Sequence, residues 1–262
     1  MLIVLSPAKS LDYDTPVRTR KHTEPRFLTE ASKLSKKLRK MSPEDLSELM
    51  NISSSLGELN FQRYANWQTP LAPGEARQAL FAFKGDVYLG LKAQDYSPAD
   101  VSYAQKHLRI LSGLYGILRP LDLMLPYRLE MGTALKTDKG DNLYQFWGDK
   151  LTCALNDELA TQRSRVLINL ASNEYFKSLD LKKIDAEIVQ PVFKDFASGK
   201  FRVLSFFAKK ARGEMASWIV RNRIDSPRAL SAFDVDGYKY SDEDSSPDRP
   251  VFTRKRKSQA AS

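Results

Sequence analysis

The chain has 262 residues, of which 42% are hydrophobic, and its 41 Lys and Arg against 32 Asp and Glu give a formal charge of +9 at pH 7. This length supports one large domain, the charge favours polyanions as partners, and the lack of an apolar run of about 20 residues argues against a membrane-spanning helix. One cysteine and two histidines exclude an intramolecular disulfide and a soft-ligand metal cluster, so a cytoplasmic protein without a metal or other cofactor is expected.

Short apolar runs without strict alternation predict strands that are buried on both faces, as in a sheet with helices on either side. The predicted strands cover residues 2–5, 80–83, 108–111, 166–170, 186–192 and 201–207. Pro191 lies inside the fifth run and predicts an edge or a bulge there, because proline cannot donate a ladder hydrogen bond.

Helix signals alternate with the strand signals. Ser42 and Ser97 each precede a proline and stand three residues before an aspartate, which predicts a capped helix start at each serine. A helix over residues 28–41 is expected to bury one apolar face. Its other face carries lysines at helical spacing: Lys33, Lys36, Lys37 and Lys40. Two further helices are predicted over residues 149–159 and 208–223.

These elements predict a mixed α/β (α+β) fold, with a single compact domain over residues 1–252 and a central mixed sheet flanked by helices. The basic residues 253–262 are expected to form a disordered tail. Cys153 lies among apolar residues of a predicted helix and is expected to fill the core. The sequence has none of the common ATP-, dinucleotide- or zinc-binding motifs and no serine nucleophile elbow, so the familiar enzyme classes lose support.

Two glycines, Gly113 and Gly116, stand three residues apart between apolar residues and just before Arg119. This spacing predicts a turn like that of a helix-hairpin-helix element, in which glycines let backbone amides approach a phosphate without reading bases. Tyr115 or Trp147, if exposed, could stack on an unpaired base, and core packing is the alternative for both rings. An equally open alternative for the glycines is a plain turn after a buried strand.

Lys209, Lys210 and Arg212 fall in the first turn of the helix predicted from about residue 208, where the helix dipole disfavours positive charge. A bound phosphate would offset this cost, because helix amides and side-chain cations would converge on one anion. A solvated charged turn is the alternative.

Polar residues also follow the predicted strands, at the edge where open α/β sheets usually bind ligands. They are Ser6, Lys9, Lys84, Asp86, Ser172, Asn173 and Glu174. With Tyr127, Arg128 and Glu130 they form a possible pocket of acids and cations, suited to acid–base or phosphate chemistry. Taken singly, Ser172 could be a helix cap and Glu174 a first-turn acid.

Several sequence blocks recur in the order of a known family. They are residues 2–9 (LIVLSPAK), 83–88 (FKGDVY), 111–122 (LSGLYGILRPLD), 126–131 (PYRLEM), 144–149 (YQFWGD), 169–172 (NLAS), 174–176 (EYF) and 208–213 (AKKARG). Through these blocks the chain resembles the YaaA family over nearly its whole length, from residue 1 to about residue 252.

The resemblance implies a bacterial cytoplasmic protein of the peroxide stress response. Such a protein would bind DNA, would be associated with lowered free intracellular iron, and would limit oxidative damage to DNA and proteins. The resemblance also implies an α/β fold with a helix-hairpin-helix element and a positively charged cleft, and the element would map onto the loop around Gly113 and Gly116.

The leading hypothesis is a monomeric binding protein that holds duplex, distorted or unpaired DNA by phosphate contacts in a basic cleft, without sequence specificity. The residues expected to bind DNA are Lys9, Lys33, Lys36, Lys37, Lys40, Gly113, Tyr115, Gly116, Arg119, Lys209, Lys210 and Arg212. The alternative is an enzyme that acts on a nucleotide or another phosphorylated small molecule, although binding is expected rather than catalysis. Its candidate catalytic residues are Lys84, Asp86, Arg128, Glu130 and Glu174. A protein-interaction module with incidental charge is a third possibility.

Overall fold

The computed structural model of this protein describes residues 1–255. Its strands are β1 Leu2–Leu5, β2 Ser10–Leu11, β3 Arg77–Gln78, β4 Phe83–Lys84, β5 Leu108–Ser112, β6 Gly116–Leu118, β7 Leu123–Met124, β8 Val166–Leu170, β9 Glu187–Val189, β10 Val192–Ala197, β11 Lys200–Arg202, β12 Lys239–Tyr240 and β13 Val251–Arg254. Its α-helices are α1 Leu28–Leu38, α2 Pro43–Met50, α3 Ser54–Asn66, α4 Ala79–Ala82, α5 Asp86–Leu91, α6 Pro98–His107, α7 Leu143–Trp147, α8 Lys150–Ala160, α9 Asn173–Phe176 and α10 Ser205–Asn222. Short 3-10 helices are η1 Ala93–Asp95, η2 Leu181–Lys183, η3 Pro227–Ala232 and η4 Val235–Gly237.

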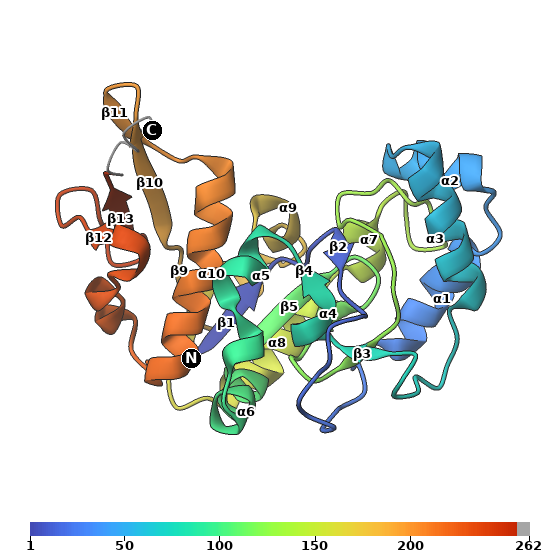
Figure 1. The fold of residues 1–262 in the computed structure, drawn as a ribbon, viewed down its shortest axis with the longest axis horizontal. Helices are drawn as coiled ribbons and strands as arrows, with labels where there is room; N and C mark the ends of the chain where they lie inside the picture. Colours follow the sequence, from blue (N-terminus) through green and yellow to red (C-terminus); the bar gives the residue numbers. More distant parts are fainter. Residues whose placement is uncertain (256–262) are drawn as a thin grey trace.

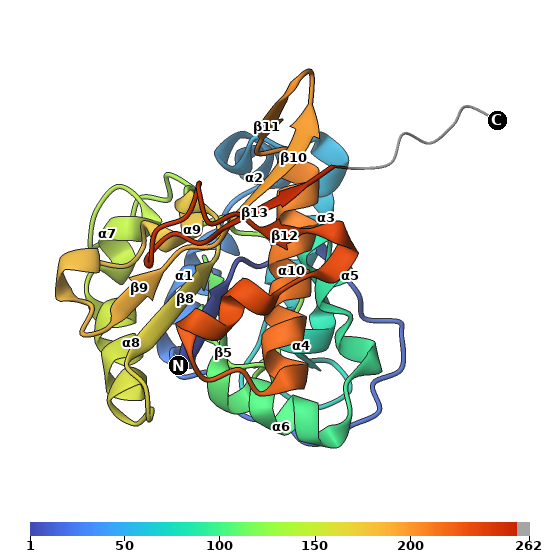
Figure 2. The ribbon, with the colours of Figure 1, turned by 90° about the vertical axis from the view of Figure 1, so that its left-hand side faces the viewer.

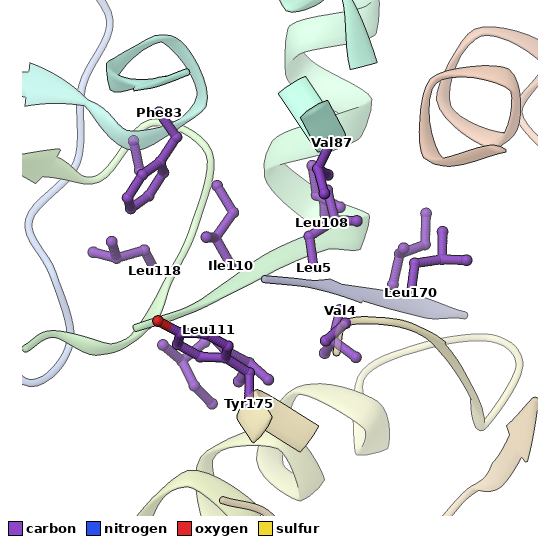
Figure 3. Close-up of a cluster of buried hydrophobic side chains, with 14 of the residues drawn as sticks. Val4, Leu5, Phe83, Val87, Leu108, Ile110, Leu111, Leu118, Leu170 and Tyr175 are labelled. Atoms are coloured by element: carbon purple, nitrogen blue, oxygen red, sulfur yellow. The ribbon is translucent and has the colours of Figure 1, made fainter. Parts of the chain in front are cut away.

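The central sheet has the strand order β6-β5-β1-β8-β9, in which β5, β1, β8 and β9 are parallel and the edge strand β6 is antiparallel. Every residue of β1, β5 and β8 is buried, as expected for strands covered on both faces. Figure 3 shows Leu5 and Ile110 on the side of Val87, and Val4 on the side of Tyr175. Alternate residues of these strands therefore enter two separate apolar layers.

A second, smaller sheet has the order β11-β10-β13-β12. Helix α10 packs against β10 and lies between this sheet and the central sheet (Figure 1). Phe193, Phe233 and Phe252 pack together, and the buried Asp195 carboxylate pairs with the Arg254 guanidinium at 2.8 Å. Figure 2 looks from the end that carries this sheet, and helices α1, α2 and α3 lie at the opposite end of the molecule.

The mixed α/β fold is confirmed, and so are the predicted strands at residues 2–5, 108–111 and 166–170. The run 186–192 is divided into β9 and β10 near Pro191, in agreement with the break that proline predicts. The single domain over residues 1–252 stays a prediction.

Two predicted strands are wrong in part. Within residues 80–83, only Phe83 is in a strand, because the preceding residues form α4. The run 201–207 is extended only to Arg202, and helix α10 begins at Ser205. Short apolar runs do not by themselves distinguish a buried strand from a buried helical turn, which explains both errors.

Both capped helix starts are confirmed, because Ser42 and Ser97 form complete capping boxes with Asp45 and Asp100. Cys153 is exposed on α8, so the expectation that it fills the core is wrong; the neighbouring buried positions of that helix already supply the packing face.

The prediction of a disordered tail from residue 253 is wrong for residues 253–254, which pair in β13, and residues 256–262 lie outside the described part of the chain. None of the helices within residues 1–255 is long and apolar enough to cross a membrane.

The segment around Gly113 and Gly116 is a β-hairpin and not a helix-hairpin-helix element. Strands β5 and β6 pair antiparallel with Ser112 opposite Gly116, whose φ of +71° closes the turn. A Cβ atom on Gly113 would lie 2.2 Å from the Leu129 carbonyl oxygen, so this glycine permits close backbone packing. Both glycines and Tyr115 are buried. The phosphate contacts predicted for them are therefore wrong.

Candidate functional site

Except for Asn173, which is exposed and outside the lining, the polar residues that follow the strands meet in a pocket of about 480 Å³ beyond the carboxyl ends of β1 and β8, here called the strand-end pocket. Its charged lining residues are Lys9, Lys84, Asp86, Arg128, Glu130, Glu174, Lys209 and Arg212. Lys9, Lys209 and Arg212 are predicted DNA contacts, and the other five are the candidate catalytic residues. The structure thus brings residues of both sets into one pocket. Lys9 and Glu174 follow the parallel strands β1 and β8, which end at the same edge of the central sheet, whereas the other charged residues come from segments outside that sheet.

Serine hydroxyls join the ends of β1 and β8 at the base of this pocket. The Ser172 backbone N–H donates to Ser6 Oγ at 2.8 Å, and the Ser6 hydroxyl donates to Ser172 Oγ at 3.3 Å. Tyr88 donates its hydroxyl to the Ser6 carbonyl at 3.0 Å. The Ser172 side chain makes no cap hydrogen bond to α9, so its contacts link the two strand ends instead.

The segment that carries Arg128 and Glu130 is fixed by buried hydroxyls. Tyr64 donates to the Arg128 carbonyl at 2.6 Å, and the hydroxyls of Ser112 and Tyr127 lie 2.6 Å apart. Burial raises the pKa of both Tyr64 and Tyr127, so these phenols stay protonated and keep their hydrogen bonds at neutral pH.

Helix α10 reaches the pocket because two glycines let it touch α5 through the backbone. A Cβ atom on Gly213 would lie 1.7 Å from the Val87 carbonyl oxygen, and one on Gly90 would lie 2.1 Å from the Lys210 carbonyl oxygen. No larger residue fits at either position without moving a helix. This close crossing brings the pocket-lining side of α10 next to residues 84–87.

Glu130 forms ion pairs with two of the pocket's cations. Its carboxylate lies 2.9 Å from Lys9 Nζ and 3.3 Å from Arg128 Nη2. The Arg128 Nε atom is buried and has no hydrogen-bond partner within residues 1–255. Glu174 accepts a hydrogen bond from the Gly132 backbone N–H at 3.0 Å.

The remaining cations of the pocket have no such partner. The side chains of Lys84, Lys209 and Arg212 make no hydrogen bond or ion pair in the part of the chain that the structure describes. Arg212 is partly buried, and burial lowers the pKa of its guanidinium without a carboxylate to offset that effect. Even partial burial of a cation without a counter-ion costs free energy, so the pocket is electrostatically suited to an anion.

Lys210 does not belong to this group, although it stands between Lys209 and Arg212. Its ammonium lies 3.0 Å from both the Glu214 and the Asp236 carboxylates, and it does not line the pocket. Burial tends to lower the Lys210 pKa, but the two carboxylates outweigh that effect and raise it. The prediction of a three-cation cluster in the first turn is wrong, because α10 begins at Ser205 and successive side chains point in different directions.

The lysine face of α1 is confirmed as an exposed face, but it is separate from the pocket. Ala31, Leu34 and Leu38 are buried on the opposite face of the helix. The exposed lysines are Lys33, Lys36 and Lys37 on α1 and Lys40 just beyond it, because the helix ends at Leu38 and not at residue 41 as predicted. None of them lines the strand-end pocket, and none makes an ion pair within the described range 1–255.

The other predicted DNA contacts are engaged within the fold. Arg119 pairs with the buried Asp122 carboxylate at 2.9 Å. Trp147 is buried and donates its indole N–H to the Gly113 carbonyl at 3.0 Å, while Tyr115 accepts from the Trp67 indole at 2.9 Å. Neither ring is available to stack on a base, so the stacking role proposed for them is wrong.

Sequence reasoning missed Gly85 and Tyr175, which also line the pocket. Gly85 lies between the candidates Lys84 and Asp86, and Tyr175 follows Glu174, so their position in the sequence could have indicated them. Burial raises the pKa of Tyr175, which keeps its phenol protonated. Among residues 1–255, no three His, Cys, Asp or Glu side chains lie together as metal ligands would.

The chain is similar to bacterial proteins of one family. A family model described as "Peroxide stress protein YaaA" matches residues 1–244. A UPF0246 protein of Teredinibacter turnerae is 54% identical over 256 residues, which cover 98% of this chain and 100% of that protein. UPF0246 proteins of Burkholderia lata and Burkholderia mallei are each 53% identical, over 97% of this chain and 99% of theirs.

Proposed function

The chain belongs to the peroxide stress protein YaaA family, and we propose that it serves that response by binding the phosphate group of a ligand in the strand-end pocket. The observation that carries this proposal is Arg212, a partly buried guanidinium that faces the pocket without a counter-ion in residues 1–255. A guanidinium matches phosphate geometry with paired hydrogen bonds. Lys84 and Lys209 supply further unpaired charge at the same pocket.

Phosphate could come from a free small molecule or from a nucleic acid, and one set of titrations separates these sources. Inorganic phosphate, a nucleoside monophosphate and a short DNA duplex are each titrated into the wild type and into Arg212→Gln. Binding of the two small ligands that is lost in Arg212→Gln supports the pocket. Absence of small-ligand binding to the wild type would overturn it. Conversion of the nucleotide during the titration would indicate an enzyme.

The resemblance to this family also implies DNA binding, and the exposed lysine face of α1 favours it as a second function. Lysines without ion pairs in residues 1–255 are free to neutralise backbone phosphates. Log affinity should then fall with log salt concentration, with a slope of about −0.9 per phosphate neutralised. Replacing Lys33, Lys36, Lys37 and Lys40 by glutamine should flatten this slope and leave small-ligand binding unchanged. An unchanged slope would remove α1 from the DNA-binding surface.

Lowered free iron is the other implied property, and we treat it as a downstream effect of ligand binding in the cytoplasm. The amount of loosely bound iron in peroxide-treated cells, measured by electron paramagnetic resonance, should differ between cells with the wild-type chain and cells with Arg212→Gln. Equal amounts would separate the pocket from iron.

A further inference from the structure

The strand-end pocket contains acids as well as cations, and a bare phosphate group does not need them. Asp86, Glu130 and Glu174 line the same pocket as Lys209 and Arg212. Carboxylates repel a phosphate and would weaken its binding if the ligand carried nothing else. A volume of about 480 Å³ is within the range for ligands of drug size and exceeds what one phosphate fills. The ligand therefore needs a second part that carries hydrogen-bond donors.

The Glu174 carboxylate is held in place through one of its oxygens, and the other oxygen has no hydrogen-bond partner among residues 1–255. Its Oε1 atom accepts from the Gly132 N–H at 3.0 Å, and a Cβ atom on Gly132 would lie only 3.3 Å from this oxygen. Tyr144 donates its hydroxyl to the Glu174 carbonyl at 2.9 Å, which fixes the backbone. The Oε2 atom makes no hydrogen bond or ion pair with any described residue. Glu174 thus presents a pre-oriented, unoccupied acceptor to the pocket.

The acceptor and the cations stand on different elements. Glu174 belongs to α9, which contacts β5, whereas Lys209 and Arg212 belong to α10, which crosses α5. Glu130, by contrast, is occupied on both oxygens by Lys9 and Arg128. One part of the pocket is therefore suited to a phosphate and another to a hydroxyl group.

We propose that the ligand of the phosphate site, on whose proposed function this step rests, is a phosphorylated sugar with free hydroxyl groups. Its phosphate contacts Arg212 and Lys209, and one sugar hydroxyl donates to Glu174 Oε2. Acidic side chains recognise ribose hydroxyls in this way beyond the strand ends of other open α/β sheets. A DNA strand has no free hydroxyl on its internal sugars, so this ligand class is a nucleotide or another sugar phosphate.

The test compares ribose 5-phosphate with methyl phosphate, which has the phosphate but no hydroxyl, by calorimetric titration. On the wild type, ribose 5-phosphate should bind about 10-fold more tightly, as expected for a hydrogen bond to a charged group. Glu174→Ala should reduce this ratio to near one. Methyl phosphate should bind Glu174→Ala as tightly as the wild type or more tightly, because a negative charge is removed. Glu174→Gln is the second variant if alanine destabilises the fold, and it should reduce the ratio in part.

The outcomes separate the two proposals. If neither phosphate ester binds the wild type, the phosphate site itself is wrong, and this inference with it. If both bind with equal affinity, or if the ratio survives in the folded Glu174 variants, the phosphate site stands and the sugar-binding role of Glu174 is overturned.

Discussion

Arg212 and Lys210 lie two residues apart on α10 and differ in what surrounds their charges. Lys210 is held between Glu214 and Asp236, so its charge is used within the fold. Arg212 is partly buried with no ion pair in residues 1–255 and faces the strand-end pocket. A partly buried cation that is not paired with an acidic residue of the fold indicates an anion-binding site.

These surroundings predict opposite effects of two matched substitutions. Arg212→Gln should weaken phosphate binding by about 10- to 100-fold, the range for hydrogen bonds to charged groups, and should leave the melting temperature unchanged or raise it. Lys210→Gln should leave phosphate affinity unchanged and lower the melting temperature, because the buried Glu214 loses its partner. Calorimetric titration and thermal unfolding of both variants measure this pattern. A common effect of both substitutions on binding would contradict it.

At the scale of elements, the pocket depends on how closely α10 approaches α5. Gly213 and Gly90 bring the two helix backbones into contact, and this contact sets the position of the α10 cations relative to residues 84–87. Helix α10 is also tied to α6. Arg223, just beyond the end of α10, forms an ion pair with Asp100 of the α6 capping box.

Gly213→Ala should disturb the pocket from a distance. Its Cβ atom would lie 1.7 Å from the Val87 carbonyl oxygen, so α10 must move away from α5. Overpacking of this kind costs about 1–3 kcal/mol, and the displaced Arg212 should bind phosphate less tightly. Urea unfolding and calorimetric titration measure the two effects. Unchanged phosphate affinity in a destabilised variant would show that the pocket does not depend on this crossing.

Asp100 should make the stability of α6 pH-dependent. Burial tends to raise the Asp100 pKa, but hydrogen bonds from Ser97 and Arg223 outweigh it, and the folded pKa is lowered. The stabilisation is therefore complete above the unfolded carboxyl pKa of about 3.9 and is lost as the pH falls through the lower folded value. Asp100→Asn should cost about 1 kcal/mol at pH 7 and progressively less in acid. Urea unfolding at several pH values tests this, and a constant difference down to pH 2 would refute it.

At the scale of the whole molecule, the pocket is assembled from segments that are far apart in the sequence. Residues 6–10, 84–87, 127–130, 170–175 and 209–212 meet only because β5, β1 and β8 lie side by side in parallel and α10 returns across β1 and β8. Helix α1, which carries exposed lysines, lies with α2 and α3 at one end of the molecule, whereas α10 borders the small sheet at the other end (Figure 1). The proposed small-ligand site and the proposed DNA-binding surface can therefore be tested separately by substitution.

Much of this arrangement is predictable from the sequence. Local sequence patterns are sufficient to predict the buried strands β1, β5 and β8. They also predict the capping boxes of α2 and α6. The polar residues after β1 and β8 could also be placed at one edge, because these strands are parallel neighbours, whereas Lys84 and Asp86 follow β4, which lies outside the central sheet.

The rest depends on tertiary contacts that local patterns do not contain. Gly113 and Gly116 have the spacing of a phosphate-binding turn. They form a β-hairpin instead, because Gly113 packs against the Leu129 backbone and β5 pairs with β6. Likewise, only the start of α10 at Ser205 and the presence of Asp236 determine that Lys210 turns away from the pocket.

A crystal of the protein soaked in arsenate, an analogue of phosphate with an anomalous X-ray signal, would locate the bound anion directly. A phosphate-binding strand-end pocket predicts an anomalous peak within hydrogen-bond distance of Arg212 and Lys209, and a clearly weaker peak in crystals of Arg212→Gln at the same arsenate concentration. Peaks confined to surface lysines such as those of α1, or an empty pocket at saturating arsenate, would contradict it.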